Sequence, residues 1–438
     1  EYAIDIGSQI AHGAIRSYVM GDRGSNNEPA NATDIAQMKK LVHEAIDAGA
    51  LGVSTSRVLG HRAMNGEPVP GTFAAEDELY GLGEALRDAG SGVFELAPAG
   101  ADGQDLGNAP KEMEWMKRLS ATIQRPVTFA LLQNETEPSL WKQLLEESLE
   151  ATEQGSQCFP QVAGRPFGLL IGLQTHHAFA KRPTFINIAH LPHNELVEQL
   201  KQSSTRTAIL NETDTDPDPK ILFDGMSRMI QSMLHRLYPM GEIPDYEPDP
   251  TQSFVSIAET RNTTPEAVLY DYMLENDGYA MGMMPIFNYV DGNHDVIREM
   301  LLHPQAVSGL SDGGAHCGMI CDASIPTFML SHWTRDRTRG KKLPLEWIIK
   351  KQTNDTASLY GLNDRGTLQT GKRADINVID YNALTLHGPK MAHDLPAGGR
   401  RLLQEATGYD YTIVAGTITR QFGQDTGQRP GRLIRGAR

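Results

Sequence analysis

The chain has 438 residues, 39% hydrophobic and 22% charged, which is enough for one large α/β barrel with an appendage or for two to three average domains. Its net charge of −15 argues against nucleic acid as a partner, because phosphate binding needs a basic surface. No apolar stretch has the length of a membrane span, and three cysteines are too few for a disulfide framework and suit a cytoplasmic location.

Residues 4–153 alternate short apolar runs with longer amphipathic patterns, the arrangement typical of βα units around a parallel sheet. Apolar side chains spaced i, i+3 and i+4 predict the helices, and short apolar runs predict the strands. We expect strands at 4–13, 49–56, 93–96, 126–132 and 157–162, and helices at 38–46, 76–89, 111–123 and 139–153.

The alternation weakens after the fifth predicted strand. Residues 164–288 are irregular and helix-rich, with proline- and acid-rich patches at 214–220 and 244–250. Long irregular segments of barrels often carry binding loops, so this pattern predicts an insertion at the barrel mouth. One further barrel strand is expected at 305–310, followed by a helix at 344–360.

Turn glycines and β-branched residues follow residue 361 and predict a small β domain with a hairpin at 411–419. The expected organisation is therefore a large α/β barrel over 1–360, with a helical insertion at about 164–290, and a β domain over 361–438.

The segment from Gly309 to His316 carries the strongest local signal for chemistry. A buried strand leads directly into Asp312 and two glycines, and the catalytic groups of parallel barrels lie at the carboxyl ends of their strands. A carboxylate there can ligate a metal, take a proton from the attacking water and pass it to a leaving amine. The same pattern is also typical of a plain turn, because Asp often begins Gly-rich turns.

Two other interpretations use the same segment. The letters of residues 309–313 fit Gly-x-Ser-x-Gly, in which Ser311 would be a nucleophile, but Gly314 is a poor start for the helix that this motif requires. His316 lies close to two cysteines that follow it, but their spacing is not usual for zinc and no fourth ligand is evident.

Positive side chains follow two of the predicted strands. Arg57, His61 and Arg62 come after the second strand, and His12 stands near the end of the first. Because positive charge at a strand's carboxyl end suits an anionic substrate, these four residues are candidates for substrate binding. Arginines paired with acids on a surface loop explain the same pattern equally well.

Taken together, these motifs resemble the metal-dependent amidohydrolases of the N-acyl-D-amino-acid deacylase (D-aminoacylase) branch. The resemblance covers nearly the whole chain, and its motifs are specific as a set. It rests on DIAQM at 34–38, AGALGVSTSR at 48–57, HR at 61–62, PVPGT at 68–72, SDG at 311–313 and RGTLQTGKRADINVID at 365–380.

The resemblance implies a distorted TIM-like (β/α)8 barrel, of which the third to eighth strands are present, with part of a small C-terminal β-sandwich. It also implies one or two zinc ions that activate a water for attack on an amide carbonyl. Asp312 matches the family's acid/base at the end of the eighth strand and is one expected metal ligand.

This sequence departs from the family pattern at the other ligands. The family places His-x-His after its first strand and a histidine at the ends of its fifth and sixth strands. Here no His-x-His occurs, and the matching strands offer Glu95 and Gln133 as oxygen ligands. We therefore expect the N-terminal segment to be missing or to be a separate fragment that carries His-x-His.

The sequence thus predicts a hydrolase that cleaves an amide carbon–nitrogen bond of a small, acylated, anionic substrate. Two alternatives stay open: a cyclic amide or lactone hydrolase on the same site, and a metal-free binding or assembly module derived from this fold. The expected partners are a small-molecule substrate and further copies of the chain in a homo-oligomer, with no nucleic acid and no membrane.

Overall fold

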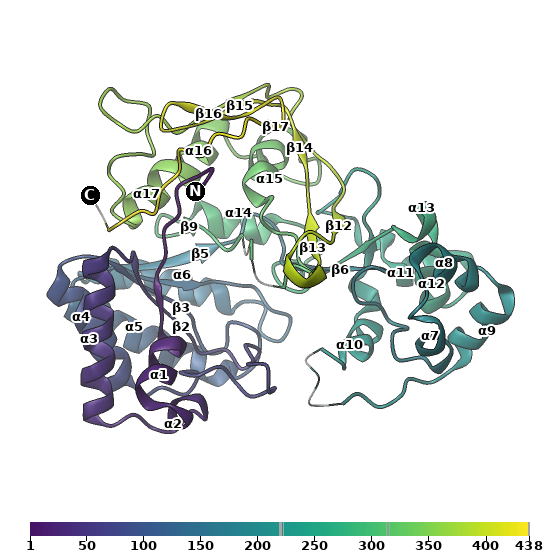
Figure 1. Ribbon diagram of the computed structural model, residues 1–438, viewed down its shortest axis with the longest axis horizontal. Coiled ribbons are helices and arrows are strands. Elements are labelled where there is room, and N and C mark those ends of the chain that lie inside the picture. Colours follow the sequence, from purple (N-terminus) through teal and green to yellow (C-terminus); the bar gives the residue numbers. More distant parts are fainter. Residues whose placement is uncertain (219–220, 222, 312, 315, 437–438) are drawn as a thin grey trace.

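The computed structural model of this chain describes residues 1–218, 221, 223–311, 313–314 and 316–436 and forms three lobes (Figure 1). The N-terminal lobe holds a parallel sheet, the middle lobe is mostly helical, and the C-terminal lobe combines helices with small antiparallel sheets. None of the described helices is both long enough and apolar enough to cross a membrane.

Six parallel strands form the main sheet, and their order follows the chain. They are β1 (Ile10–Ala11), β2 (Gly52–Ser56), β3 (Val93–Ala97), β4 (Val127–Ala130), β5 (Cys158–Val162) and β9 (Val307–Ser308). The prediction of an α/β protein with a parallel sheet is confirmed. Among the described residues, the ladders end at β1 on one edge and at β9 on the other, and no ladder joins the two.

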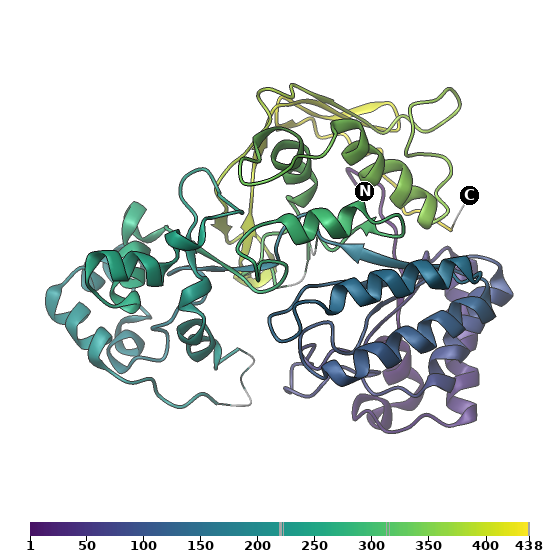
Figure 2. The same ribbon diagram turned by 180° about the vertical axis from the view of Figure 1, so that it is seen from behind.

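Helices alternate with these strands, and α3 to α6 pack against one another in chain order along the sheet (Figure 2). Asn31 begins α3 by accepting hydrogen bonds from two backbone N–H groups, and Gly49 ends it in a left-handed conformation. The helices of this lobe are α1 (His12–Met20), α2 (Asp22–Ser25), α3 (Ala32–Ala48), α4 (Glu76–Ala89), η1 (Leu106–Asn108), α5 (Ala109–Ile123) and α6 (Leu140–Glu153).

The prediction of a first strand over residues 4–13 is wrong in its extent. Only β1 pairs with β2, and α1 already begins at His12. The physical reason is the spacing of the buried side chains: Ile15, Arg16 and Met20 share one helix face, whereas a strand would bury alternate residues.

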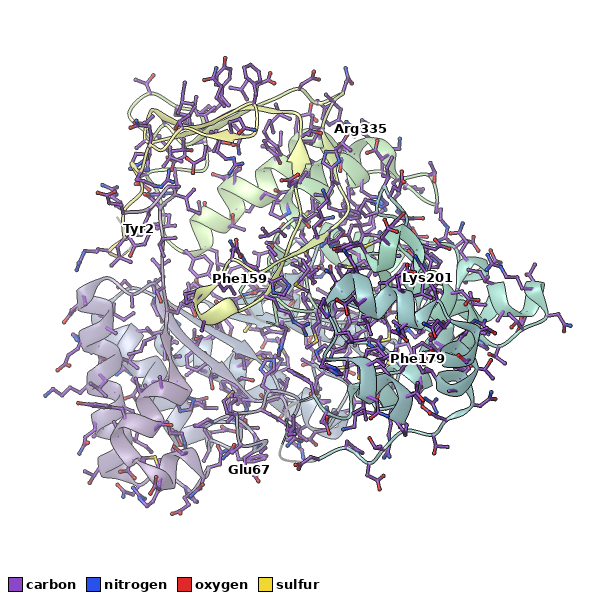
Figure 3. The ribbon with its side chains drawn as sticks, turned by 45° about the vertical axis from the view of Figure 1, so that its right-hand side comes forward. Tyr2, Glu67, Phe159, Phe179, Lys201 and Arg335 are labelled. Atoms are coloured by element: carbon purple, nitrogen blue, oxygen red, sulfur yellow. The ribbon has the colours of Figure 1, made fainter. Side chains whose placement is uncertain are left out.

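The segment between β5 and α14 forms the middle lobe and has an apolar core of its own, in which Figure 3 labels Phe179. Strands β6, β8 and β7 form a small antiparallel sheet beside it. Its elements are β6 (Gly168–Ile171), α7 (Pro183–Ile188), α8 (His193–Leu200), α9 (Ser203–Asn211), α10 (Met226–Ser232), η2 (Leu234–Arg236), β7 (Tyr238–Pro239), η3 (Pro250–Gln252), α11 (Phe254–Arg261), α12 (Pro265–Met273), α13 (Glu275–Gly278) and β8 (Gly282–Pro285).

His177 is a packed, neutral histidine in this second core. Its ring lies 4.5 Å from that of Phe185, its Nδ1 accepts a hydrogen bond from the Phe179 N–H, and burial lowers its pKa to about 3. Below about pH 6.5 the unfolded chain binds a proton here that the folded chain does not, so the free energy of unfolding falls by about 1.4 kcal/mol per pH unit. Between pH 6.5 and 4.5, urea denaturation of His177→Asn should therefore show about 2 kcal/mol less acid-induced loss than the parent chain.

His43, which is 41% exposed on α3, provides the matched control for this measurement. His43→Asn should keep the pH slope of the parent chain. If the parent and His177→Asn lost stability in parallel over this pH range, the burial argument for His177 would be contradicted.

The C-terminal lobe packs helices against three small antiparallel sheets. The helical elements are α14 (Asp295–Leu302), α15 (Ile325–Ser331), the π-helical η4 (His332–Asp336), α16 (Leu345–Lys350), the π-helical η5 (Lys351–Asp355), α17 (Thr356–Leu359) and η6 (Pro396–Gly398). The strands are β10 (Ile376–Ile379), β11 (Thr385–Leu386), β12 (Lys390–Ala392), β13 (Arg401–Leu403), β14 (Ala406–Thr407), β15 (Tyr409–Val414), β16 (Thr417–Gln421) and β17 (Gln424–Asp425). The predicted hairpin is the antiparallel pair β15 and β16.

The two ends of the described chain run side by side (Figure 1). Tyr2 and Ile6 form bridges with Gly431 and Leu433, and the buried Asp5 carboxylate accepts hydrogen bonds from Arg365 and other donors of the C-terminal lobe. These contacts tie the segment before β1 to the C-terminal lobe.

Candidate functional site

The carboxyl ends of the six parallel strands meet at one edge of the sheet. Gln161 of β5 pairs in parallel with Val307 of β9, and the Gly309 N–H continues this ladder to the Val162 carbonyl. The segment that follows β9 therefore leaves the sheet at the edge where parallel barrels place their catalytic groups. Asp312 belongs to this segment and lies outside the described residues.

The loop after β2 carries two of the predicted substrate residues at this edge. His61 Nδ1 lies 2.6 Å from the Ser56 hydroxyl, and Ser56 is the last residue of β2. Arg62 donates to the Gly66 carbonyl within the same loop. Both His61 and Arg62 are exposed, so a ligand at the strand ends can reach them.

Arg57, the third predicted substrate residue, is engaged by the protein. Its guanidinium donates to both carboxylate oxygens of Glu112 on α5, at 3.0 and 2.8 Å, and to the Ala74 carbonyl. It also lies over the Trp115 ring. Its charge is thereby balanced inside the protein, and it joins the β2 loop to α5.

His12 is fully buried, although sequence reasoning placed it at an open strand end. Its Nδ1 lies 2.8 Å from Thr55 Oγ1 and its Nε2 lies 2.8 Å from Glu78 Oε1. Arg16 approaches the same Glu78 oxygen at 3.5 Å. These contacts join α1, β2 and α4, so His12 touches protein groups rather than the space at the strand ends.

Glu95 on β3 is half-buried and faces the ends of two distant segments. Its Oε2 accepts hydrogen bonds from Gln9 Nε2 at 2.6 Å and from the Tyr360 hydroxyl at 2.8 Å. Burial and the Glu95 charge together raise the pKa of Tyr360 well above its usual range, so Tyr360 stays a donor. Both bonds use Oε2, and no described residue bonds to Oε1.

Gln133, the other predicted oxygen ligand, has both of its amide atoms engaged. Its Oε1 accepts from the Val290 N–H at 3.3 Å, and its Nε2 donates to Asp291 at 3.2 Å. Its backbone also pairs with Asn288. Gln133 therefore links the end of β4 to the loop after β8.

Sequence reasoning missed one group of potential metal ligands. Within the described ranges, Glu247, His294 and His332 are the three residues whose carboxylate and ring-nitrogen atoms all lie within 4.8 Å of one another. We call these three residues the Glu247 cluster. The residues lie far apart in the sequence, and among their three segments only the proline- and acid-rich patch around Glu247 carries a sequence signal.

The electrostatics of the Glu247 cluster fix the charge of two members. Burial raises the pKa of Glu247, but hydrogen bonds from His332 and Arg337 outweigh burial and hold that pKa well below its usual range. Burial lowers the pKa of His294 to about 3. At neutral pH the cluster therefore contains a carboxylate and a neutral imidazole.

Known proteins resemble this chain over nearly its whole length. Three uncharacterized mycobacterial proteins, one from Mycobacterium bovis and two from strains of Mycobacterium tuberculosis, are each 26% identical over 461 residues, covering 97% of this chain and 69% of theirs. Two solved structures share the fold with a TM-score of 0.57: a D-aminoacylase at 20% identity, and the N-acyl-D-glutamate deacylase of Bordetella bronchiseptica, complexed with zinc and a phosphonate inhibitor, at 17%. The alignments cover 98% and 99% of this chain and 71% and 72% of those proteins.

A family model also matches the chain. Residues 2–236 and 263–420 match the family described as "Amidohydrolase family", which takes in most of the chain. The chain therefore belongs to the amidohydrolase family, and it is a hydrolase that acts on carbon–nitrogen bonds other than peptide bonds.

Proposed function

We propose that this enzyme hydrolyses the amide bond of a small, acylated, anionic substrate, in the manner of an N-acyl-D-amino-acid deacylase. The parallel pairing of β9 with β5 is the observation that supports the proposal, because the described residues that follow β9 leave the sheet at its carboxyl edge, and Asp312 is the next residue after Ser311. His61 and Arg62 are exposed at that edge and would contact the substrate's carboxylate.

In the proposed reaction, Asp312 acts first as a general base and then as a general acid. It takes a proton from water while the water oxygen bonds to the amide carbon. When the tetrahedral intermediate collapses, the carbon–nitrogen bond breaks and Asp312 returns the proton to the leaving nitrogen. The products are a carboxylate and an amine.

Zinc is the metal that we propose for this site, from the family resemblance and from the zinc in the related N-acyl-D-glutamate deacylase. Asp312 and Glu95 are the ligands that we assign to it, because Glu95 Oε1 faces no described partner, whereas both amide atoms of Gln133 are used. A zinc site needs three or four protein ligands, and the described residues at the strand ends do not supply the third. Each reaction step is therefore assigned to protein groups.

The proposal extends to the organisation of the chain. We assign residues 1–360 to the amidohydrolase barrel, with its helical insertion at about 164–290, and residues 361–438 to the β domain. The middle lobe's own apolar core supports this division, because a segment with its own core can be inserted without disturbing the sheet.

A panel assay tests the substrate class. The purified chain, supplied with zinc, would be incubated with N-acyl-D- and N-acyl-L-amino acids, cyclic ureides and lactones, and products would be followed by mass spectrometry. Release of a free amino acid from an acidic N-acyl substrate is the expected result. Ring opening without any deacylation would replace the proposal with the cyclic amide or lactone alternative.

A further inference from the structure

The Glu247 cluster stands apart from the strands of the parallel sheet. Glu247 lies in the loop before η3, His294 lies just before α14, and His332 is the first residue of η4. Glu247 Oε2 lies 3.1 Å from His332 Nε2 and 3.8 Å from His294 Nδ1, and these two ring nitrogens lie 3.2 Å apart. Ligand atoms about 2.1 Å from a tetrahedral zinc ion stand about 3.4 Å from one another, and the three separations bracket that value.

Hydrogen bonds around the cluster fix which atoms face its centre. His294 Nε2 lies 2.8 Å from the Tyr246 carbonyl, which can only accept, so Nε2 carries the proton and Nδ1 turns a lone pair toward the other two residues. Glu247 Oε2 is also an acceptor. His332 Nε2 therefore faces two electron-pair donors, and without a metal it donates its proton to Glu247 Oε2. When that proton leaves, three lone pairs meet there, and a metal ion can take its place.

Arg337 also binds Glu247, but it does not lie between the three ligand atoms of the cluster. It donates to Oε1 at 2.9 Å and to Oε2 at 3.1 Å, and Oε1 also accepts the His294 backbone N–H at 2.7 Å. These bonds hold the carboxylate in one orientation, as outer hydrogen bonds do around metal-binding carboxylates. Oε2 keeps a lone pair directed at the two histidines.

A cavity of about 450 Å³ gives access to the cluster. Glu247 and His332 line it, whereas His294 does not. The His332 ring, stacked on Phe328 at 4.4 Å, forms part of its wall. An ion can therefore enter from the cavity, and a fourth ligand such as water can reach it from the same side.

We propose that Glu247, His294 and His332 bind one divalent transition-metal ion, best matched by zinc, with its fourth coordination position open to this cavity. Two imidazoles and one carboxylate are a ligand set that zinc uses in sites with an open position. This ion is separate from the zinc proposed at the strand ends. It joins the loop of the middle lobe to α14 and η4, so binding it stabilises the packing of these three segments.

Metal analysis of the full chain tests the proposal. Chelator-treated protein would be dialysed against zinc, and the bound zinc per chain would be counted. We expect His332→Ala, which removes the least buried ligand, to hold one ion fewer than the parent chain and to bind it at least about 100-fold more weakly. His43→Ala, at an exposed position on α3, is the matched control and should keep the ion.

The same measurement separates this ion from the catalytic one. Asp312→Asn should keep the cluster's ion, whatever happens to the zinc at the strand ends. Equal zinc content and affinity in folded His332→Ala and the parent chain would overturn the proposal. If His332→Ala did not fold, zinc-edge anomalous diffraction from zinc-soaked parent crystals would decide: a peak among the three ligand atoms supports the site, and its absence from ordered density overturns it.

Discussion

Replacing Asp312 with Asn should lower kcat by about 10²- to 10⁴-fold, the usual contribution of a general acid–base group. Asn has nearly the same shape but cannot take a proton from water at neutral pH or return it to nitrogen. KM should change little, because His61 and Arg62, which we assign to substrate binding, are unaltered. Steady-state kinetics on the best substrate of the panel would measure kcat and KM, and urea denaturation would check that the variant is folded.

Ser311→Ala is the matched control for this experiment. It lies next to Asp312 and tests the alternative in which Gly-x-Ser-x-Gly supplies a nucleophile. We expect Ser311→Ala to keep the parent's kcat. Loss of activity in Ser311→Ala with retention in Asp312→Asn would reverse the assignment, and parental turnover by Asp312→Asn alone would already contradict it.

Local patterns predicted the parallel sheet well, because the spacing of apolar residues within each βα unit is enough to predict its strand and its helix. Helix α4 covers the residues expected for it, and β3 and β5 lie within one residue of their predicted bounds. The segment before β1 could not be predicted in this way. Its residues form bridges with residues 431 and 433 at the opposite end of the chain, and no local period reveals such a partner.

In the candidate site too, features set by nearby residues were predictable and features set by distant residues were not. The loop after β2 was expected at a strand end, and His61 Nδ1 indeed lies within hydrogen-bond distance of Ser56, the last residue of β2. Sequence reasoning could not tell that Arg57 would be paired, because Glu112 lies 55 positions further along the chain. For His12, the helix period of α1 is present in the sequence, but the apolar run before it resembles a strand and hides where the helix begins.

The Glu247 cluster was beyond sequence reasoning for a further reason. Its histidines stand 38 positions apart, and Glu247 precedes the first of them by 47. Metal motifs are recognised by short spacings on one helix or loop, and here three separate segments each give one residue. In the folded chain, the loop before η3, the residue before α14 and the first residue of η4 come together.

Arg337→Met should lower the free energy of unfolding by about 3–5 kcal/mol, because it leaves a buried carboxylate without its cation. The side chain of Arg337 is 0% exposed and that of Glu247 only 3%, so water can approach Glu247 only from the cavity that it lines. The deficit should depend on pH. In the parent, the lowered pKa of Glu247 adds stability above its unfolded value, near 4.5, and this stability is lost as the pH falls through the folded value.

In Arg337→Met, Glu247 loses a partner that lowers its pKa, so it becomes neutral at a higher pH and the deficit shrinks toward pH 4. Urea denaturation with a chelator present, at pH 7 and at pH 4.5, would measure both values without a contribution from zinc.

Arg206→Met is the matched control: its partner Asp271 is 54% exposed, so the loss should stay within about 1 kcal/mol. The double variant Glu247→Gln/Arg337→Met should recover much of the stability, because it removes the unpaired charge. If Arg337→Met cost no more than Arg206→Met, Glu247 would not be the buried anion that the cluster requires, and its role as a metal ligand would be lost as well.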